Sequence, residues 1–155
     1  MRHHYWTPTD YQQISAAKNF DDLLVVANNV IARTPKPIYQ VCGPISTGGA
    51  GSVEKNLEVF DQAIEHFSNY ANLFDQIPFE DPIQELKKTD KRDLLEIFYR
   101  PIIGSENIDT LLFLPDWRSS DGAQKEWAMG EKYGLRRVEL PGNWKTKTLA
   151  QVTQE

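Results

Sequence analysis

The sequence predicts an α/β fold, with a parallel sheet of about four to five strands and helices on both of its faces. Short apolar runs alternate along the chain with segments whose apolar residues recur every three to four positions, which is the pattern of strands alternating with helices. The clearest strand is "IDTLLFLP", residues 108–115, because its nearly continuous apolar run is typical of a strand buried on both faces.

The N-terminal part of the chain is predicted to add one helix, over residues 10–33, to this sheet. Its apolar residues fall at helical spacing: Phe20, Leu23, Leu24, Ala27, Val30 and Ile31. Pro35 and Pro37 end it, because proline lacks a backbone donor and restricts the residue before it. The first strand is expected at 38–44, followed by the glycine-rich loop "ISTGGAGS".

The remaining elements follow the same alternation. From Ser52, a plausible N-cap, the spacing predicts a helix, and a second short strand is expected within 71–79. The segment "EDPIQELKKTD" is interpreted as a loop or irregular helix, and 91–103 as a helix that ends at Pro101. A helix over 121–133, a last strand over 136–140 and a surface tail complete the chain. We therefore expect a helical extension (1–36), a Rossmann- or flavodoxin-like domain (37–142) and a tail (143–155).

Composition narrows the classes of function. The chain has 155 residues, which suits one domain, and a net charge of −5, which disfavours a surface that coats nucleic acid. No apolar run is long enough to cross a membrane, and the first residues lack the apolar core of a signal peptide, so a cytoplasmic protein is expected. Cys42 is the single cysteine, and His3, His4 and His66 show no metal-ligand spacing. Neither a metal nor a cofactor is expected.

Two loops rich in glycine and serine follow predicted strands. In a parallel α/β sheet, ligands bind beyond the carboxyl ends of the strands, where both "GPISTGGAGS" (43–52) and "PDWRSSDG" (115–122) are expected. The first loop precedes a helix whose free N–H groups favour an anion, but it matches neither the P-loop nor the GxGxxG pattern. A plain strand-to-helix connection is an equally good interpretation of this loop alone.

Several acidic and polar residues accompany these loops. Ser120 or Asp121 can cap the following helix, and Glu126 comes about one and a half turns into it. Taken singly, Ser120 and Asp121 are most simply interpreted as helix caps and Glu126 as a solvated glutamate. The predicted position of both loops and Glu126 at one edge of the sheet is what favours a ligand site. Asp93 suits a helix start, and Asp109 enters its strand at the end opposite the loops, where a structural role is expected. Tyr39 lies in the first strand.

Three segments together resemble the nucleoside 2-deoxyribosyltransferase superfamily, including its hydrolytic relatives that act on nucleoside 5′-monophosphates. They are "IYQVCGPISTGG", "KRDLL" and "IDTLLFLPDWRSSDGAQKEWAMGEKYG", and they span most of residues 38–140. The W-x-S-S-x-G-A-x-x-E pattern in the last segment is the most specific part. The N-terminal helix has no counterpart, the segment after Asp93 is lengthened, and the first loop lacks the arginines of phosphate-specific members.

The resemblance implies an enzyme that cleaves the N-glycosidic bond of nucleosides or nucleotides, by hydrolysis or by transfer to a second base. Glu126 would be the nucleophile, Asp93 would protonate or hold the leaving base from a buried position, and Tyr39 would orient Glu126. Arg118 is the only cation within the second loop. The resemblance places substrate binding at Gly43, Pro44, Ile45, Ser46, Gly48, Gly49, Asp116, Trp117, Ser119, Ser120 and Gly122.

The implied partners are a small nucleoside or nucleotide and further copies of the chain in a homo-oligomer, without nucleic-acid polymer or membrane. Two other classes of function remain open on the sequence. A non-catalytic nucleotide-binding protein would keep the pocket without turnover. A structural or partner-binding domain would use the N-terminal helix for assembly.

Overall fold

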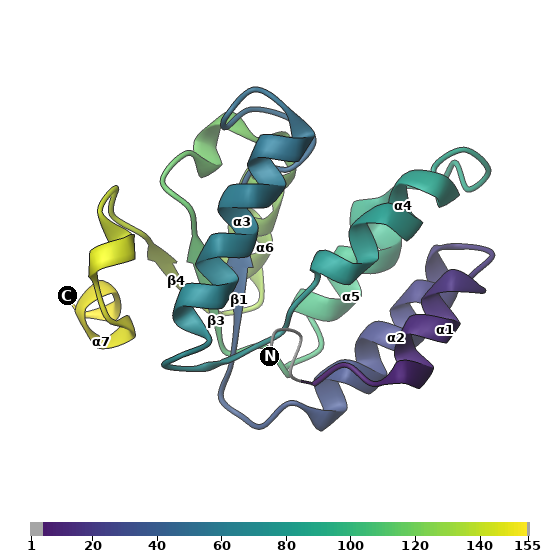
Figure 1. The fold of residues 1–155 in the computed structure, drawn as a ribbon, viewed down its shortest axis with the longest axis horizontal. Helices are drawn as coiled ribbons and strands as arrows, with labels where there is room; N and C mark the ends of the chain where they lie inside the picture. Colours follow the sequence, from purple (N-terminus) through teal and green to yellow (C-terminus); the bar gives the residue numbers. More distant parts are fainter. Residues whose placement is uncertain (1–4, 155) are drawn as a thin grey trace.

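Four parallel strands form the centre of the molecule in a computed structural model that describes residues 5–154 (Figure 1). The sheet order is β2 (Asn72–Leu73), β1 (Ile38–Cys42), β3 (Thr110–Phe113) and β4 (Arg136–Glu139). Tyr39 of β1 pairs with Thr110 of β3, which pairs in turn with Arg136 of β4. The expected α/β fold, Rossmann-like with a parallel sheet and an N-terminal helical addition, is confirmed.

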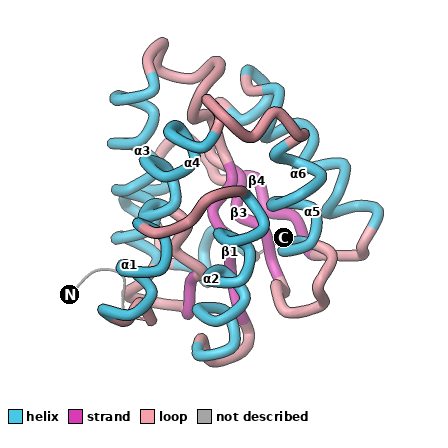
Figure 2. Tube along the Cα trace, turned by 90° about the vertical axis from the view of Figure 1, so that its right-hand side faces the viewer, coloured by secondary structure: helices cyan, strands magenta, loops and turns pink. Residues whose placement is uncertain are grey.

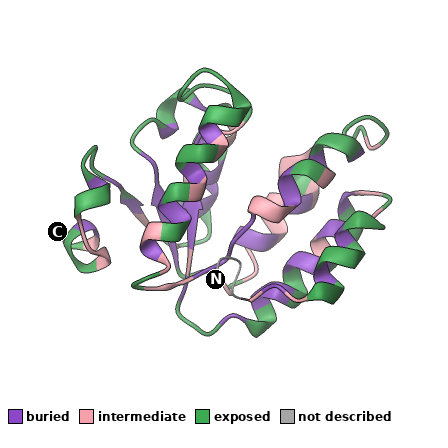
Figure 3. Cartoon of the chain, viewed as in Figure 1, coloured by how far each residue is buried: buried purple, intermediate pink, exposed green. Residues whose placement is uncertain are grey.

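Helices cover both faces of the sheet, as Figure 2 shows for α3 on one side and α5 and α6 on the other. One apolar cluster joins Ile38, Cys42, Leu111 and Phe113 to helices α1 (Pro8–Ser15), α2 (Phe20–Arg33), α4 (Glu80–Leu86), α5 (Arg100–Ile103) and α6 (Asp121–Lys132). A second joins Val41, Leu112, Leu114 and Val138 to α3 (Val53–Phe67) and α7 (Leu149–Thr153). Because strand side chains alternate, the two clusters lie on opposite faces of the sheet. The central strands β1 and β3 between them are almost entirely buried (Figure 3).

The N-terminal segment contains two helices where one was predicted. Thr7 starts α1 with a capping box to Asp10, and Asn19 starts α2 by accepting the N–H of Asp22 at 2.9 Å. The residues between them leave the helical path because Asn19 supplies a new N-cap. Arg33 near the end of α2 pairs with Asp10 of α1, which holds the two helices together.

The segment between β2 and β3 also differs from the prediction. Residues 80–90, interpreted as loop or irregular helix, begin with the helix α4, which directly follows a 3-10 helix η1 (Ile77–Phe79). The helix expected to end at Pro101 is a π-helical turn η2 (Leu95–Tyr99) that continues into α5 through Ile103. Pro101 lies in the first turn of α5, directly after the π-helical turn.

The ends of the sheet show two further features. Asp109 has the structural role expected of it, since its carboxylate accepts the N–H of Ile38 at 2.6 Å where β1 begins. The tail was predicted to lie on the surface, but Trp144 and Val152 are buried and cover the sheet beside β4. His3 and His4 lie outside the described residues. Within residues 5–154, no helix has both the length and the apolar character needed to cross a membrane.

Candidate active site

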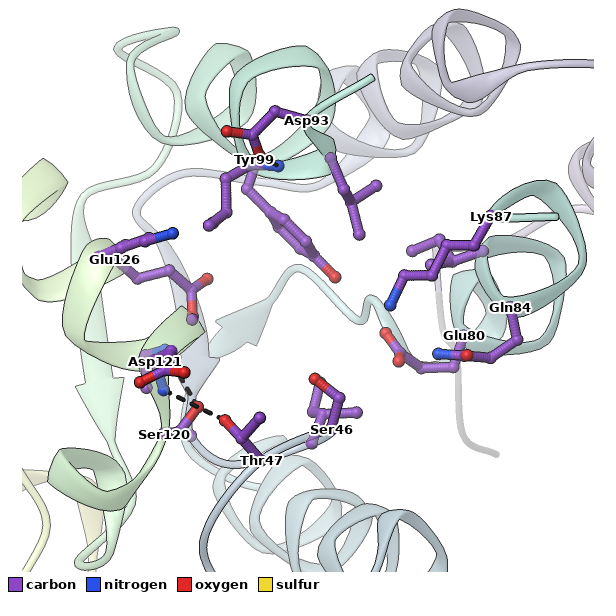
Figure 4. Close-up of a pocket in the computed structure, with 18 residues that line it drawn as sticks. Ser46, Thr47, Glu80, Gln84, Lys87, Asp93, Tyr99, Ser120, Asp121 and Glu126 are labelled. Atoms are coloured by element: carbon purple, nitrogen blue, oxygen red, sulfur yellow. Dashed lines mark hydrogen bonds between the residues drawn. The ribbon is translucent and has the colours of Figure 1, made fainter. Parts of the chain in front are cut away.

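A cavity of about 240 Å³ lies beyond the carboxyl ends of β1 and β3 (Figure 4). The loop after β1 and the first turns of α6 form one side of it, and α4 and η2 form the other. Its volume is just below the roughly 300–1,000 Å³ of typical small-molecule sites. The position is the one that parallel α/β sheets use for ligands.

The two loops predicted to meet at this edge lie side by side. The N–H of Gly49 donates to Oγ of Ser119 at 2.7 Å, and the N–H of Asp121 donates to Oγ1 of Thr47 at 3.2 Å. Gly48 has φ +70°, and a Cβ there would lie 2.1 Å from the backbone oxygen of Ser119. Glycine is therefore required at position 48, both for the left-handed backbone and for the close approach of the loops.

Glu126 faces the cavity from α6, and its residue is only 8% exposed. The buried positions of α6 are Ala123, Glu126, Met129 and Gly130, so the glutamate occupies the stripe that packs on the sheet. Burial is the main reason that its pKa rises to about 8. A hydrogen bond with the Cys42 thiol opposes this rise, and the charge of Glu80 adds to it. No salt bridge among residues 5–154 involves Glu126.

Glu80, the first residue of α4, provides a second buried carboxyl that sequence reasoning missed. It is 6% exposed and lines the cavity, and its Oε2 has no hydrogen-bond partner among the described residues. Burial raises the pKa of Glu80 to about 7. Lys87 lowers that pKa, Asp81 raises it, and a hydrogen bond from the Tyr99 hydroxyl lowers it. The spacing of Glu80, Ile83 and Lys87 places all three on the cavity side of one helix.

Tyr99 lines the cavity between the two carboxyls, and Figure 4 shows its hydroxyl pointing into the space between Glu126 and Glu80. Burial raises the pKa of Tyr99 well above its usual range, and the charges of Glu80 and Glu126 raise it further, so the phenol remains a hydrogen-bond donor. Tyr39, expected to orient Glu126, does not line the cavity. It packs against the cluster beneath α3, on the face of the sheet opposite Cys42.

Asp93 lies at the rim of the cavity and is exposed, so the buried position expected of it is not found. Its Oδ1 accepts the N–H of Leu95 at 3.0 Å. This contact serves the start of the helical segment. The buried carboxyl on this side of the cavity is Glu80 instead.

The other predicted substrate-binding residues divide into two groups. Five line the cavity: Gly43, Ile45, Ser46, Ser120 and Gly122. Six do not line it: Pro44, Gly48, Gly49, Asp116, Trp117 and Ser119. Those of the second group shape the loops or the core, as Trp117 does by stacking on Trp127 with ring centroids 4.5 Å apart.

Two lysines supply positive charge at the cavity, where the sequence had indicated only Arg118 nearby. Lys87 and Lys125 line the cavity. Arg118 lies over the Trp117 ring and pairs with Glu139 at 2.7 Å. Within residues 5–154, no group of three or more His, Cys, Asp or Glu side chains could hold a metal ion.

Comparisons with protein-family models, with curated proteins and with solved structures each returned no match for this chain.

Proposed function

We propose that this protein is an N-glycosidase or deoxyribosyltransferase-like enzyme that acts on nucleosides or nucleoside monophosphates, with Glu126 as its nucleophile. The observation that carries the proposal is a buried glutamate without an ion-pair partner, facing a cavity that both loops border. A buried carboxyl in a structural role is normally paired, whereas one directed into a cleft with a shifted pKa is characteristic of catalytic sites. The resemblance of the two loop segments supports the same chemistry.

The reaction would proceed in two displacements at C1′ of the sugar. The ionised carboxylate of Glu126 forms a bond to C1′ while the C1′–N bond breaks. The electron pair of the C1′–N bond leaves with the base. Water then attacks C1′ and restores the carboxylate, which gives hydrolysis. If the nitrogen of a second base attacks instead, the sugar is transferred.

The sugar would bind beside Glu126, where polar groups from both loops meet. Ser46, Thr47 and Ser120 line this side of the cavity. Ser120 is also the N-cap of α6 and accepts the N–H of Ala123 at 3.2 Å, so its hydroxyl is held in place. Lys125 and the positive end of α6 favour a substrate with a 5′-phosphate.

One observation favours a second candidate function, a nucleotide-binding protein without turnover. With a pKa of about 8, Glu126 is mostly neutral at pH 7 in the empty cavity, and a neutral carboxyl is a poor nucleophile. A binding protein would need only the cavity and its hydrogen-bonding groups.

The test is release of free base, measured by liquid chromatography, from a panel of ribo- and deoxyribonucleosides and their 5′-monophosphates. We expect Glu126→Ala to lower kcat by several orders of magnitude, because the covalent route is lost. Glu131→Gln, a substitution on the exposed side of the same helix, is the control and should retain wild-type turnover. A 2′-fluoro analogue should leave its sugar on Glu126, detected by peptide mass.

Two results would refute this assignment. Turnover of the Glu126→Ala variant close to wild type would exclude Glu126 as the nucleophile. A ligand-induced rise in Tm without any base release would support the binding protein instead.

A further inference from the structure

Glu80 lies across the cavity from Glu126 and Ser120, beyond the ring of Tyr99 (Figure 4). A nucleoside whose C1′ is at Glu126 and whose 5′ end is at Ser120 would therefore extend its base toward α4. The groups on that side are Glu80, Gln84 and Lys87, and Ile83, Leu94 and Tyr99 give apolar surface for a ring. This half of the cavity is therefore suited to a flat, polar-edged base.

The free oxygen of Glu80 is the observation that calls for a ligand. Leaving a buried acceptor without a hydrogen bond is unfavourable, so native structures seldom retain one without a role. The Tyr99 hydroxyl hydrogen-bonds the Glu80 carboxyl, and the charged groups that face this carboxyl are Lys87, Asp81 and, across the cavity, Glu126. Among the described residues, none of these groups hydrogen-bonds Oε2 of Glu80. A bound base would provide the missing partner.

We infer that Glu80 holds the leaving base and gives it a proton, and that the preferred bases carry a ring nitrogen beside an exocyclic amino group, as cytosine and adenine do. This inference rests on the proposed function, which supplies the bond cleavage at C1′. It assigns to a residue of α4 the task that the sequence had placed on Asp93.

The chemistry of the base edge explains the preference. A neutral carboxyl presents a donor and an acceptor side by side, and it can pair with an amino edge or with a keto edge. On that edge, only the ring nitrogen beside an amino group is basic enough to accept the proton. In the corresponding keto bases, uracil and hypoxanthine, that nitrogen already carries a hydrogen. The preference should therefore appear in turnover rather than in binding.

The proton and electron balance of the first displacement is complete with groups on the chain. The acidic proton of Glu80 moves to the ring nitrogen of the base, and Glu80 becomes a carboxylate. The electron pair of the C1′–N bond goes to the base, which leaves as the neutral molecule. Glu126 forms the new bond to C1′. In the second displacement Glu80 takes the proton from the attacking water. Burial favours the neutral form of Glu80 at the start of this cycle.

The decisive test varies the leaving group. We expect Glu80→Gln to lower kcat/KM on a cytosine or adenine substrate by roughly 100- to 10,000-fold, the usual contribution of a general acid. On p-nitrophenyl 2-deoxyribofuranoside, whose phenolate leaves without a proton, the loss should shrink to less than about tenfold. Glu85→Gln, an exposed site on the same helix, is the control on both substrates.

The results separate failure of the inference from failure of the proposed function. If Glu80→Gln lowers kcat/KM equally on both substrates, or on neither, Glu80 is not the general acid. The proposed glycosidase activity would be unaffected by that result. Equal kcat for cytosine and uracil substrates, and for adenine and hypoxanthine substrates, would overturn the base preference. If the wild type cleaves neither the nucleosides nor the nitrophenyl glycoside and forms no 2′-fluoro adduct, the proposed function itself fails, and the role of Glu80 with it.

Discussion

Glu126 and Glu80 are two carboxyls withdrawn from water into one cavity, and their ionisation is coupled. Burial raises both pKa values, and the charge of Glu80 adds to the rise at Glu126. Once one carboxyl is ionised, its negative charge raises the pKa of the other. The cavity therefore favours a state with one neutral and one ionised carboxyl. The proposed reaction requires this state, because it uses one carboxylate as nucleophile and one neutral carboxyl as acid. The fold is destabilised when both carboxyls are ionised.

The free energy of unfolding should therefore depend on pH through Glu126. Its pKa is 4.5 without the fold and about 8 within it, so the folded chain binds more protons between these values and stability falls as pH rises through that range. Glu126→Gln removes this loss. Near pH 8 we expect the variant to be more stable by about 4 kcal/mol, which is a rise in Tm of about 10 °C. Near pH 4.5 the difference should vanish.

Thermal unfolding monitored by circular dichroism across this pH range would measure the effect. Glu131→Gln, whose carboxylate is exposed, should follow the wild type at every pH. Identical pH slopes for wild type and Glu126→Gln would show that Glu126 ionises in the folded protein as freely as in solvent.

At the scale of elements, the site is built where two loops close against each other at the edge of the sheet. The Gly48–Ser119 approach fixes the distance between the loop after β1 and the start of α6. Because Thr47 accepts the N–H of Asp121, the same contact positions the first turn of α6 and with it Glu126. The position of Glu126 therefore depends on a glycine that does not itself line the cavity.

Gly48→Ala should disturb this junction. A left-handed backbone costs a residue with a Cβ roughly 1–2 kcal/mol, and the overlap with Ser119 adds to it, so we expect a loss of about 2–3 kcal/mol in urea denaturation. Gly142→Ala is the matched control, since a Cβ there meets nothing within 4 Å. Equal midpoints for the two variants would mean that the loops can separate without cost.

The sequence predicted this half of the site because its signals are local. A strand, a glycine loop and a capped helix follow one another in both segments, and parallel topology then brings the loops to one edge. The other half was missed for two reasons. Pro82 interrupts the apolar spacing of α4, so the segment was interpreted as loop or irregular helix and Glu80 was not recognised as a site residue. The π-helical turn adds a residue before α5, so a regular helical period from Asp93 gives no indication that Tyr99 faces the cavity.

At the scale of the whole molecule, α1 and α2 belong to the same core as the sheet. Phe20, Leu23 and Val30 of α2 are buried in the cluster that contains Phe98 of η2. The N–H of Phe20 donates to Asp90 at 3.0 Å, and Arg92 pairs with Asp21 at 2.7 Å. The N-terminal segment that the sequence suggested as a one-helix extension thus forms two helices that support the wall of the cavity that carries Tyr99.

A shortened chain of residues 37–155 should consequently lose cooperative unfolding. Removing α2 exposes Phe98 of η2 and Ile102 and Ile103 of α5, which are buried in one cluster with the apolar residues of α2. Far-ultraviolet circular dichroism with a thermal ramp would reveal a broad transition in place of a sigmoidal one. The full chain is the control and should show a sigmoidal transition. A sharp transition for residues 37–155 would establish an independent domain.

The thiol at the end of β1 makes the cavity observable by infrared spectroscopy. Cys42 is the only cysteine in the sequence, it is buried, and it hydrogen-bonds Glu126. Burial and then the charge of Glu126 raise its pKa well above the usual range, so the thiol keeps its proton while Glu126 titrates. The S–H stretch absorbs in a region of the infrared spectrum where other protein groups do not absorb. Its frequency therefore reports, in the unlabelled protein, whether the neighbouring carboxyl is charged, neutral or esterified by a sugar.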